Sequence, residues 1–465
     1  MVGSGPNGLA AAITLAQKNL KVLVIEGKEV IGGGSRSAEL TLPDFTHDIC
    51  SAVHPLAASS VFFRSLPLER FGLKWIFPPV SLAHPLDDRP AALVYPSLHQ
   101  TTEGLGEDGI AYTQLMKPLL DRWDRLSKDL LGPLRIPKHP FLLARFGLLA
   151  LQSAQGLAFR RFHAPEAQAI FGGMAAHAML PLDSFASASF GLVLTLSAHA
   201  VGWPVAAGGS QKIVDALAAY FKVLGGEIRT GWQVTSLDEL PEAKVILLDV
   251  APNQLLSLTG DRLKGFYKRQ LTRYRFGPGV FKMDWALDGP IPWQDEHVKY
   301  SATVHVGGTL EEIAAAEKSI WRGEHPQHPY VLLSQPSLFD PLRAPEGKHT
   351  AWAYCHVPPG STENRQEAIE NQIERFAPGF KARILARHTI NAAEYEQYNP
   401  NYVGGDINAG VQDLGQFFTR PVVRWNPYST PIRGLYLCSA STPPGGGVHG
   451  MCGLLAAQSA LEREF

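Results

Sequence analysis

The sequence predicts an α/β protein in which a Rossmann-like nucleotide-binding domain is interleaved with a second, α+β domain. Three observations predict this fold. A glycine triplet begins at the third residue, an apolar run ending in an acid follows it, and a second glycine-rich turn joins an apolar run to a small-residue helix near the C-terminus. Turns of this composition lie at the carboxyl ends of parallel strands, where nucleotides bind.

The first turn is Gly3-Ser4-Gly5-Pro6-Asn7-Gly8. The glycine at position 3 permits a tight turn, the one at 5 lets the backbone approach a pyrophosphate, and the one at 8 lets the next helix pack close to its strand. A helix that begins near Pro6 points its positive dipole end at the phosphates. A turn that holds no ligand is the alternative interpretation of the triplet alone.

The segment after the triplet predicts a helix over residues 9–17 and a buried parallel strand over residues 21–26, KVLVIE. Glu26 ends this strand about 20 residues after the glycines, where a carboxylate accepts hydrogen bonds from a ribose diol. The same acid would repel a 2′-phosphate, which favours a plain adenosine nucleotide. A solvated strand end is the alternative role of Glu26.

A third glycine cluster, Gly32-Gly33-Gly34-Ser35-Arg36, follows this strand. Its glycines can wrap the outer side of a pyrophosphate and bring the guanidinium to it. Near the C-terminus, the apolar run 434–440 leads through a glycine-rich turn, 445–450, into a small-residue helix at 454–461. Such a turn lets a flat ring approach backbone amides at a positive dipole end, which suits the N1–C2 carbonyl edge of a flavin.

Four motifs together resemble the phytoene desaturase-like branch of the FAD-dependent amine oxidase superfamily: GSGPNGLAAA, VIEGKEVIGGGSRS, GGSQK at 208–212, and GLYLCSASTPPGGGVHGMCG. The resemblance covers essentially the whole chain and implies an FAD-binding domain of the p-hydroxybenzoate hydroxylase/glutathione reductase type. It places Val234 on an adenine-side strand and residues 243–250 on a return strand. The residues implied in cofactor binding are Gly3, Gly5, Pro6, Asn7, Gly8, Glu26, Gly33, Gly34, Ser35, Arg36, Val234, Gly446, Gly447, Val448 and His449.

One departure from the family pattern concerns the first strand, of which only Met1 and Val2 precede the first glycine. The family places five or six apolar residues there, in the centre of the parallel sheet. We therefore expect a mis-assigned or truncated start, with weakened FAD binding as its consequence because buried backbone groups would lack partners.

The nucleotide-binding pieces are predicted at residues 1–85, 205–255 and 425–465, and the substrate domain at 86–204 and 256–424. Residues 226–234 predict two short strands around a turn. The substrate domain is expected to hold a helix at 119–131, with Pro118 in its first turn, and antiparallel strands. These strands are predicted at 279–287, 330–335 and 349–357.

Residues 139–159 form the most apolar helical stretch, and Arg160 and Arg161 follow it. One interpretation is a helix that dips into a bilayer and admits a lipophilic substrate, with the arginines at headgroups. The other is a helix packed over the substrate cavity or against a second copy in a homodimer. The packed helix is the interpretation we favour.

The composition indicates an enzyme of the reducing cytosol. The 42 basic and 43 acidic residues leave no charge excess to attract nucleic acid, and the four cysteines form no CxxC pair. We expect a cytoplasmic protein, because no signal peptide fits before the first glycine and no apolar stretch could span a membrane. Histidines such as His47, His84 and His99 lack the spacing of a metal site, so no metal is expected.

The candidate catalytic residues are His449, inside the C-terminal glycine motif, His54, and Lys282, which lies where amine oxidases of the superfamily hold a water near the flavin. A structural histidine and a solvated strand lysine are the alternatives. His177, His305 and His356 are further candidates for a base.

Three functions are consistent with these features. The first is dehydrogenation of a lipophilic or isoprenoid-like chain by hydride transfer to flavin N5, with oxygen or a quinone as the final acceptor. The second is oxidation of an amine, which the lack of an aromatic pair before the C-terminal glycines disfavours. The third is a non-catalytic prenyl-binding escort protein, which has no physical reason to keep Glu26, Arg36 and the glycine motif.

Overall fold

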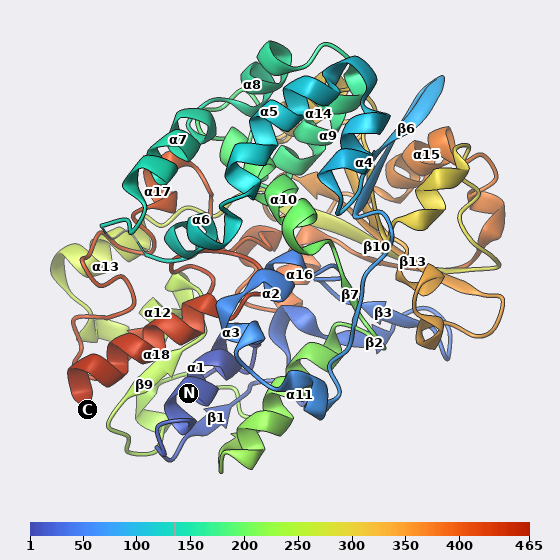
Figure 1. The fold of residues 1–465 in the computed structure, drawn as a ribbon. Coiled ribbons are helices and arrows are strands. Elements are labelled where there is room, and N and C mark those ends of the chain that lie inside the picture. Colours follow the sequence, from blue (N-terminus) through green and yellow to red (C-terminus); the bar gives the residue numbers. More distant parts are fainter. Residues whose placement is uncertain (134–135) are drawn as a thin grey trace.

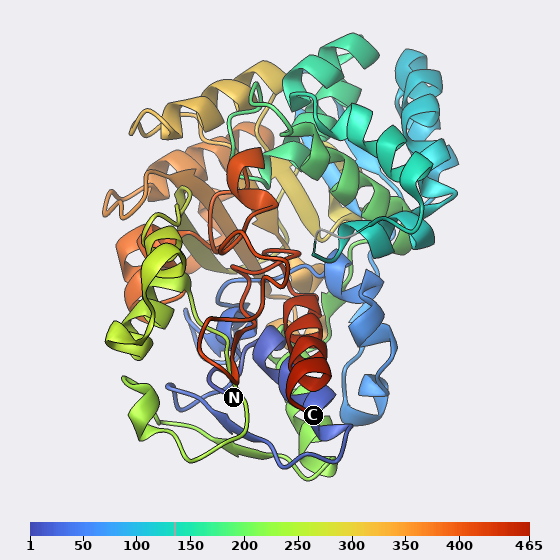
Figure 2. The ribbon, with the colours of Figure 1, turned by 90° about the vertical axis from the view of Figure 1, so that its left-hand side faces the viewer.

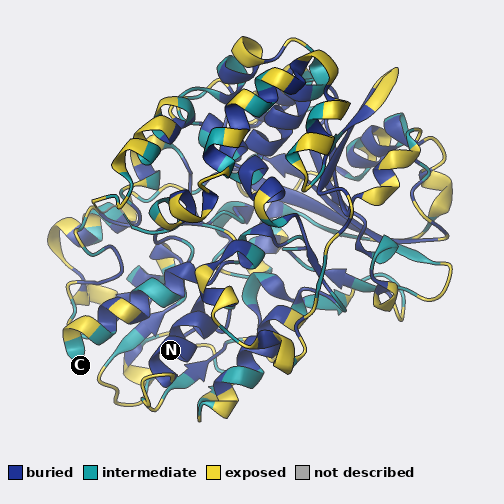
Figure 3. Cartoon of the chain, viewed as in Figure 1, coloured by how far each residue is buried: buried dark blue, intermediate teal, exposed yellow. Residues whose placement is uncertain are grey.

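A computed structural model of the chain describes residues 1–133 and 136–465. A parallel sheet with its helices forms one end of the molecule, and a seven-stranded sheet covered by helices forms the other (Figures 1 and 2). Both termini lie at the end that holds the parallel sheet. Buried residues follow the strands and the inner faces of the helices (Figure 3). The predicted α/β class is confirmed.

The parallel sheet is built around the first two residues. Val2 bridges in parallel to Ile25 on one side and to Leu248 on the other, so it lies between strands β1 and β9. Strand β8 pairs in parallel with β1, and β15 pairs in parallel with β9. The predicted central place of Met1 and Val2 is thus confirmed. The strands are β1 (Leu23–Ile25), β8 (Glu227–Arg229), β9 (Ile246–Leu248) and β15 (Leu435–Leu437).

Small residues let two helices pack closely beside this sheet. Helix α1 (Pro6–Ala16) lies against α18 (Met451–Glu464), and α11 (Gln211–Val223) packs on α1 as well. A Cβ on Gly453 would overlap the carbonyl oxygen of Asn7, so α18 can approach the first turn of α1 only because position 453 has no side chain. The alanines at 10, 11 and 12 are fully buried.

The seven-stranded sheet has the order β14-β10-β13-β12-β11-β5-β6. The pairs β10–β13, β10–β14, β11–β12, β12–β13 and β5–β6 are antiparallel, and β11 pairs with β5 in parallel. The three strands predicted from alternation are confirmed as β10, β12 and β13. The bounds are β5 (Leu82–Leu86), β6 (Arg89–Val94), β10 (Gly279–Leu287), β11 (Thr303–Val306), β12 (Val331–Ser334), β13 (His349–Val357) and β14 (Ile384–Ile390).

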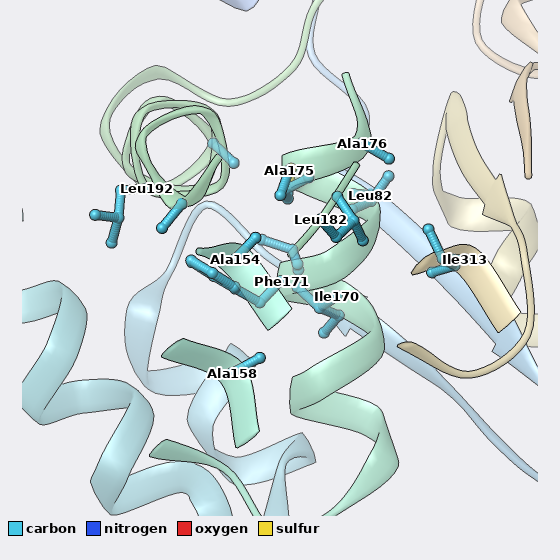
Figure 4. Packing of buried hydrophobic residues seen from close by; sticks show 14 of the residues in the cluster. Leu82, Ala154, Ala158, Ile170, Phe171, Ala175, Ala176, Leu182, Leu192 and Ile313 are labelled. Carbon is cyan, nitrogen blue, oxygen red and sulfur yellow. The ribbon is translucent and has the colours of Figure 1, made fainter. Parts of the chain in front are cut away.

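A helical core covers one face of this sheet. Figure 4 shows Ala154 and Ala158 of α8, Phe171 of α9, Leu192 of α10 and Ile313 of α14 gathered in it. On the other face, Ile369 and Ile373 of α15 join the strands. The helices of this end are α4 (Leu98–Gly104), α5 (Gly109–Leu120), α6 (Trp123–Leu130), α7 (Pro140–Ala150), α8 (Ala154–Arg161), α9 (Pro165–Ala176), α10 (Ala188–Val201), α14 (Leu310–Ile320) and α15 (Gln366–Phe376).

Short elements connect the two ends, and β2 pairs with β3 while β4 pairs with β7, both antiparallel. The division of the chain into two domains at the predicted boundaries stays a prediction. The short elements are β2 (Ser37–Glu39), β3 (Thr46–Asp48), β4 (Trp75–Ile76), β7 (Val205–Ala206), α2 (Pro55–Ser59), α3 (Val61–Arg64), α12 (Pro252–Thr259), α13 (Gly265–Thr272), α16 (Ala392–Tyr398) and α17 (Leu414–Phe417).

Two predicted local elements are wrong. Residues 119–131 do not form one helix: α5 continues through Pro118 to Leu120, and α6 begins at Trp123. Pro118 lacks an amide donor and crowds the preceding turn, and the helix ends two residues after it. Residues 226–234 contain one strand, β8, instead of two: past β8 the amides of Gly231 and Trp232 donate to the carbonyls of Lys28 and Glu26, and no second strand forms.

The apolar stretch 139–159 is divided between α7 and α8. Over the described residues, no single helix has the length and apolar character to cross a membrane, although α7 and α8, bent by 92° to each other, pass that test as a pair. Helix α7 buries Phe146 and Ala150 in the helical core and leaves Phe141 and Leu148 exposed. Contact of this segment with lipid stays a prediction, and so does a homodimer.

Candidate cofactor and substrate site

A cavity of about 400 Å³ lies between the two sheets. One part of it, the nucleotide part, is lined by Val2–Asn7, Glu26–Lys28, Gly33–Arg36, Trp232–Val234, Asp249–Ala251, Ser439 and Ala440. The other part, the sheet part, is lined by His177, Phe190, Leu194, Trp203, Thr303, Leu332, Leu333, Trp352 and Tyr354. Residues 50–56, Tyr402 and Gly446–Val448 also line it, so the two predicted glycine motifs open into the same space.

The glycine triplet is packed against a carboxyl that sequence reasoning missed. A Cβ at Gly3 or Gly5 would lie 3.0 Å from the Asp249 side chain, and one at Gly8 would overlap the carbonyl oxygen of Gly3. The amide of Gly8 donates to Oδ2 of Asp249 over 2.9 Å. Burial raises the pKa of Asp249 to about 7, with Glu26 raising it further and the Gly8 amide opposing. Asp249 directly follows strand β9, whose other neighbour is Val2, and that position is the available signal for it.

The first turn of α1 has no side-chain cap, and its residues Gly5, Pro6 and Asn7 line the cavity. The side-chain oxygen Oδ1 of Asn7 is buried without a partner among the described residues. The Gly8 amide is engaged by Asp249 and Pro6 has no amide, so this helix start offers a phosphate the amide of Asn7 and its positive dipole end. The glycine turn and the start of α1 thus open into the cavity, and the binding of a pyrophosphate there stays a prediction.

Glu26 and Arg36 form a buried pair at the edge of the nucleotide part, with Nη2 of Arg36 3.1 Å from Oε1 of Glu26. The other carboxylate oxygen accepts from the amide and hydroxyl of Ser4, and Oε1 also accepts from the amide of Lys28. The guanidinium lies over the ring of Tyr398, 5.8 Å from its centroid. A solvated strand end is thereby excluded for Glu26, which is 8% exposed.

His449 lies behind the C-terminal glycine turn, not in the cavity wall, which Gly446, Gly447 and Val448 form. Its Nδ1 accepts from the amide of Met451 over 3.0 Å, so its Nε2 donates to the carbonyl of Gly445 over 3.1 Å. Burial lowers the pKa of His449 to about 4, although contacts with the carbonyls of Gly445 and Gly446 oppose this. With both nitrogens engaged, this ring holds the turn at the start of α18. The geometry does not bring it to a reacting atom.

Lys282 does not line the cavity either. Its Nζ donates to both oxygens of Asp284, over 2.5 and 2.6 Å, and to the carbonyl of Asp48 over 2.9 Å. The side chain is 1% exposed, so the alternative of a solvated strand lysine is wrong. The ammonium lies 5.9 Å from the ring of Trp352, a residue that lines the cavity. Lys282 therefore acts on the cavity only through its neighbours.

His54 is the one of the three predicted catalytic residues that lines the cavity. The hydroxyl of Ser210 donates to the carbonyl of Ser51 over 2.6 Å, so Nε2 of His54 donates to that hydroxyl, over 2.9 Å. Its Nδ1 is a buried acceptor without a partner among the described residues. Burial lowers the pKa of His54 to about 4, which keeps the ring neutral.

Most of the predicted cofactor-binding residues line the cavity, and two do not. Gly8 and His449 lie outside the cavity lining, whereas the following residues line it: Gly3, Gly5, Pro6, Asn7, Glu26, Gly33, Gly34, Ser35, Arg36, Val234, Gly446, Gly447 and Val448. No group of three or more His, Cys, Asp or Glu in the described part of the chain could hold a metal ion.

Sequence reasoning missed the aromatic wall of the sheet part. Trp352 and Tyr354 lie two residues apart on β13, with their rings edge to face at 5.2 Å. They stand on the cavity side of the sheet because alternate residues of a strand share a face. The sequence has no aromatic pair before the C-terminal glycines, and this pair comes instead from a strand far from them in the sequence.

Fold and sequence similarities indicate an oxidoreductase with a Rossmann-like nucleotide-binding domain, similar in sequence to phytoene desaturases and in fold to an amine oxidase. Residues 1–64 match the family model described as an NAD(P)-binding Rossmann-like domain. The chain is similar to the rat (Rattus norvegicus) pyridine nucleotide-disulfide oxidoreductase domain-containing protein 2, with 26% identity that covers 98% of this chain and 92% of that protein. The predicted resemblance is confirmed.

Two further similarities are more distant. A neurosporene-forming phytoene desaturase from Rhodobacter capsulatus is 24% identical over 58% of this chain and 56% of its own. The structure of cyclohexylamine oxidase from Brevibacterium oxydans superposes with a TM-score of 0.62 at 14% identity, covering 99% of this chain and 98% of that one. This last similarity concerns the fold alone.

Proposed function

We propose that this chain binds FAD and dehydrogenates a neutral, lipophilic substrate. A single observation carries the proposal: one cavity joins the glycine turns of the nucleotide part to an aromatic and apolar sheet part. Among the described lining residues, the carboxyl side chains are Glu26 and Asp249, both in the nucleotide part. The sheet part therefore offers no charge partner to a cationic substrate and suits a neutral one.

The residues of the nucleotide part fit an FAD molecule. The uncapped start of α1 and the glycines at 33 and 34 would hold the pyrophosphate, and Glu26 would accept from the ribose hydroxyls. Arg36 already lies beside Glu26 and would contribute positive charge. When bound, FAD supplies a two-electron acceptor for hydride transfer.

The chain's own residues would orient the substrate and exclude water. Phe190, Leu194 and Leu332 present an apolar surface, and Trp352 with Tyr354 closes it on the sheet side. His54 is neutral, and its Nδ1 is fully buried, so this ring shapes the cavity wall and does not take a proton from the substrate.

Amine oxidation is the second candidate, and the aromatic pair Trp352–Tyr354 favours it. An ammonium group is attracted by aromatic faces, and cyclohexylamine oxidase shares this fold. Anaerobic mixing of the oxidised protein with terpenoid substrates or with primary amines separates the two candidates. Bleaching of the flavin absorbance by terpenoids alone supports the proposal, whereas bleaching by amines alone replaces it.

Glu26→Gln is expected to reduce FAD affinity by roughly tenfold or more, because hydrogen bonds to a charged group contribute about 1.5–3 kcal/mol. Glutamine keeps the size of the side chain and one acceptor oxygen for Ser4, although its amide group then faces the guanidinium of Arg36, whereas alanine removes both acceptors. The measurement is the flavin-to-protein absorbance ratio after desalting at a series of FAD concentrations.

The matched control for this variant is Glu29→Gln, which changes an exposed acid three residues away. Equal flavin retention by wild type and Glu26→Gln would remove Glu26 from the ribose site. Absence of a flavin spectrum from wild type, even with FAD added, would support the escort-protein alternative.

A further inference from the structure

His177 is held at the end of helix α9, with its ring in the sheet part of the cavity. The helical core of Figure 4 fixes α9 through Phe171, Ala175 and Ala176. The ring meets Trp203 edge to face at 5.6 Å, and the side-chain amide of Asn408 donates to the carbonyl of His177 over 3.2 Å. This histidine is therefore a fixed part of the cavity wall.

The nitrogen Nε2 of His177 is engaged with a second, fully buried histidine. It lies 2.9 Å from Nε2 of His305, so one of these two atoms must carry a hydrogen. The other nitrogen of His305, Nδ1, is buried and has no partner among the described residues. A buried N–H without an acceptor is rarer and costlier than an unpaired acceptor, so the hydrogen of His305 belongs on Nε2.

This assignment fixes the free side of His177. Because Nε2 of His177 accepts from His305, the neutral ring carries its own hydrogen on Nδ1. Burial lowers the pKa of His177 to about 3, and His356 adds to the effect, so the ring stays neutral. Nδ1 of His177 has no hydrogen-bond partner in the described chain. Unlike Nδ1 of His305, it is not fully buried. It is the nitrogen that a ligand in the cavity can reach.

Two other donors in the same wall lack acceptors. The indole nitrogens of Trp203 and Trp352 are buried and unpartnered among the described residues, and both side chains line the cavity. An indole N–H donates only. These two donors lie beneath the surface of the wall, so Nδ1–H of His177 is the donor that faces the cavity, and within the described residues the sheet part holds no carboxylate.

We propose that the sheet part recognises an oxygen acceptor, a carbonyl or hydroxyl group, on an otherwise apolar substrate, and that the Nδ1–H of His177 donates the hydrogen bond to it. This inference rests on the proposed function and narrows its substrate class. A pure hydrocarbon would leave the donor unpaired, and an alkylammonium ion brings no acceptor lone pair.

The test compares ligands that share a ten-carbon skeleton: geraniol, geranylamine and the parent hydrocarbon 2,6-dimethylocta-2,6-diene. Their binding is followed by quenching of tryptophan fluorescence, since Trp203 lies against His177, and is confirmed by calorimetry. This readout does not need flavin, so the loss of FAD binding and the loss of ligand selectivity are separate results. We expect geraniol to bind about tenfold more tightly than the hydrocarbon, with geranylamine no better than the hydrocarbon.

Two variants test whether His177 causes the preference for geraniol. His177→Phe keeps a ring against Trp203 and should abolish the preference for geraniol without changing affinity for the hydrocarbon. Phe190→Leu, an apolar change in the same wall, should alter all three ligands alike. Three results with wild type would overturn the inference: equal binding of geraniol and the hydrocarbon, tighter binding of geranylamine, or binding of none of the three ligands. A preference for geraniol that survives in His177→Phe would overturn it as well. The wild-type comparison stands even if the variant fails to fold.

Discussion

Replacing Asp48 by alanine is expected to destabilise the folded protein by about 3–5 kcal/mol, the usual cost of breaking a buried ion pair from one side. The carboxylate accepts from Nη1 of Arg343 over 2.8 Å, and its other oxygen accepts from the amide of Ser210 and the hydroxyl of Ser37, each over 2.7 Å. The Arg343 side chain is fully buried, so alanine leaves it with Asp340 as its remaining carboxylate.

The loss is expected at neutral pH, where Asp48 is ionised. Burial opposes the ionisation of Asp48, but Arg343, the Ser210 amide and the Ser37 hydroxyl lower its pKa overall. A lowered folded-state pKa means that the stabilisation is present above the unfolded-state value and is lost as the pH falls through the folded-state value. Urea unfolding at pH 7 is therefore the suitable measurement.

Two comparisons make this prediction specific. Asp288→Ala removes an exposed partner of Lys348 and should leave the unfolding midpoint nearly unchanged. The double variant Asp48→Ala, Arg343→Met should be destabilised by less than the sum of the two single variants, because the Asp48–Arg343 pair is lost only once. A double variant whose destabilisation equals that sum would contradict the assignment of the effect to this pair.

The nucleotide part of the cavity could be predicted from the sequence better than the sheet part. The glycines at 3, 5 and 8, Glu26 and Arg36 lie within 36 residues, and their spacing alone specifies the turn, strand and second turn. Spacing along the chain is enough here because each of these residues shapes the turn or strand that contains it or follows it directly. The three glycine motifs and the strand types follow from such patterns.

The catalytic candidates needed long-range information. Lys282 reads as a strand residue in VFKMDWAL, but the nearby Asp284 and the distant carbonyl of Asp48 engage its ammonium. His449 lies within the predicted motif, yet its ring supports the motif from behind. The pairing of His177 with His305 joins residues 128 positions apart, and no spacing rule connects them.

Asp249→Asn is expected to change how stability depends on pH. The folded-state pKa of Asp249 is about 7, raised by burial from an ordinary value of 3.8. Because the folded state holds this proton more tightly than the unfolded state, wild-type stability falls as the pH rises from about 4 to 7, and the loss is complete above 7. Each pKa unit corresponds to about 1.4 kcal/mol, so the loss between pH 5.5 and 8.5 is about 2 kcal/mol.

Asparagine keeps an acceptor for the amide of Gly8 but cannot ionise. Urea unfolding of Asp249→Asn should therefore show about 2 kcal/mol less pH dependence than wild type over this range, and Asp261→Asn, an exposed change, should follow wild type. Cofactor retention should respond in the same direction, because an ionised Asp249 beside the glycine turn would repel a pyrophosphate. Wild type should thus lose FAD more readily above pH 7 while Asp249→Asn does not, and parallel pH profiles for the two proteins would place the titrating charge elsewhere.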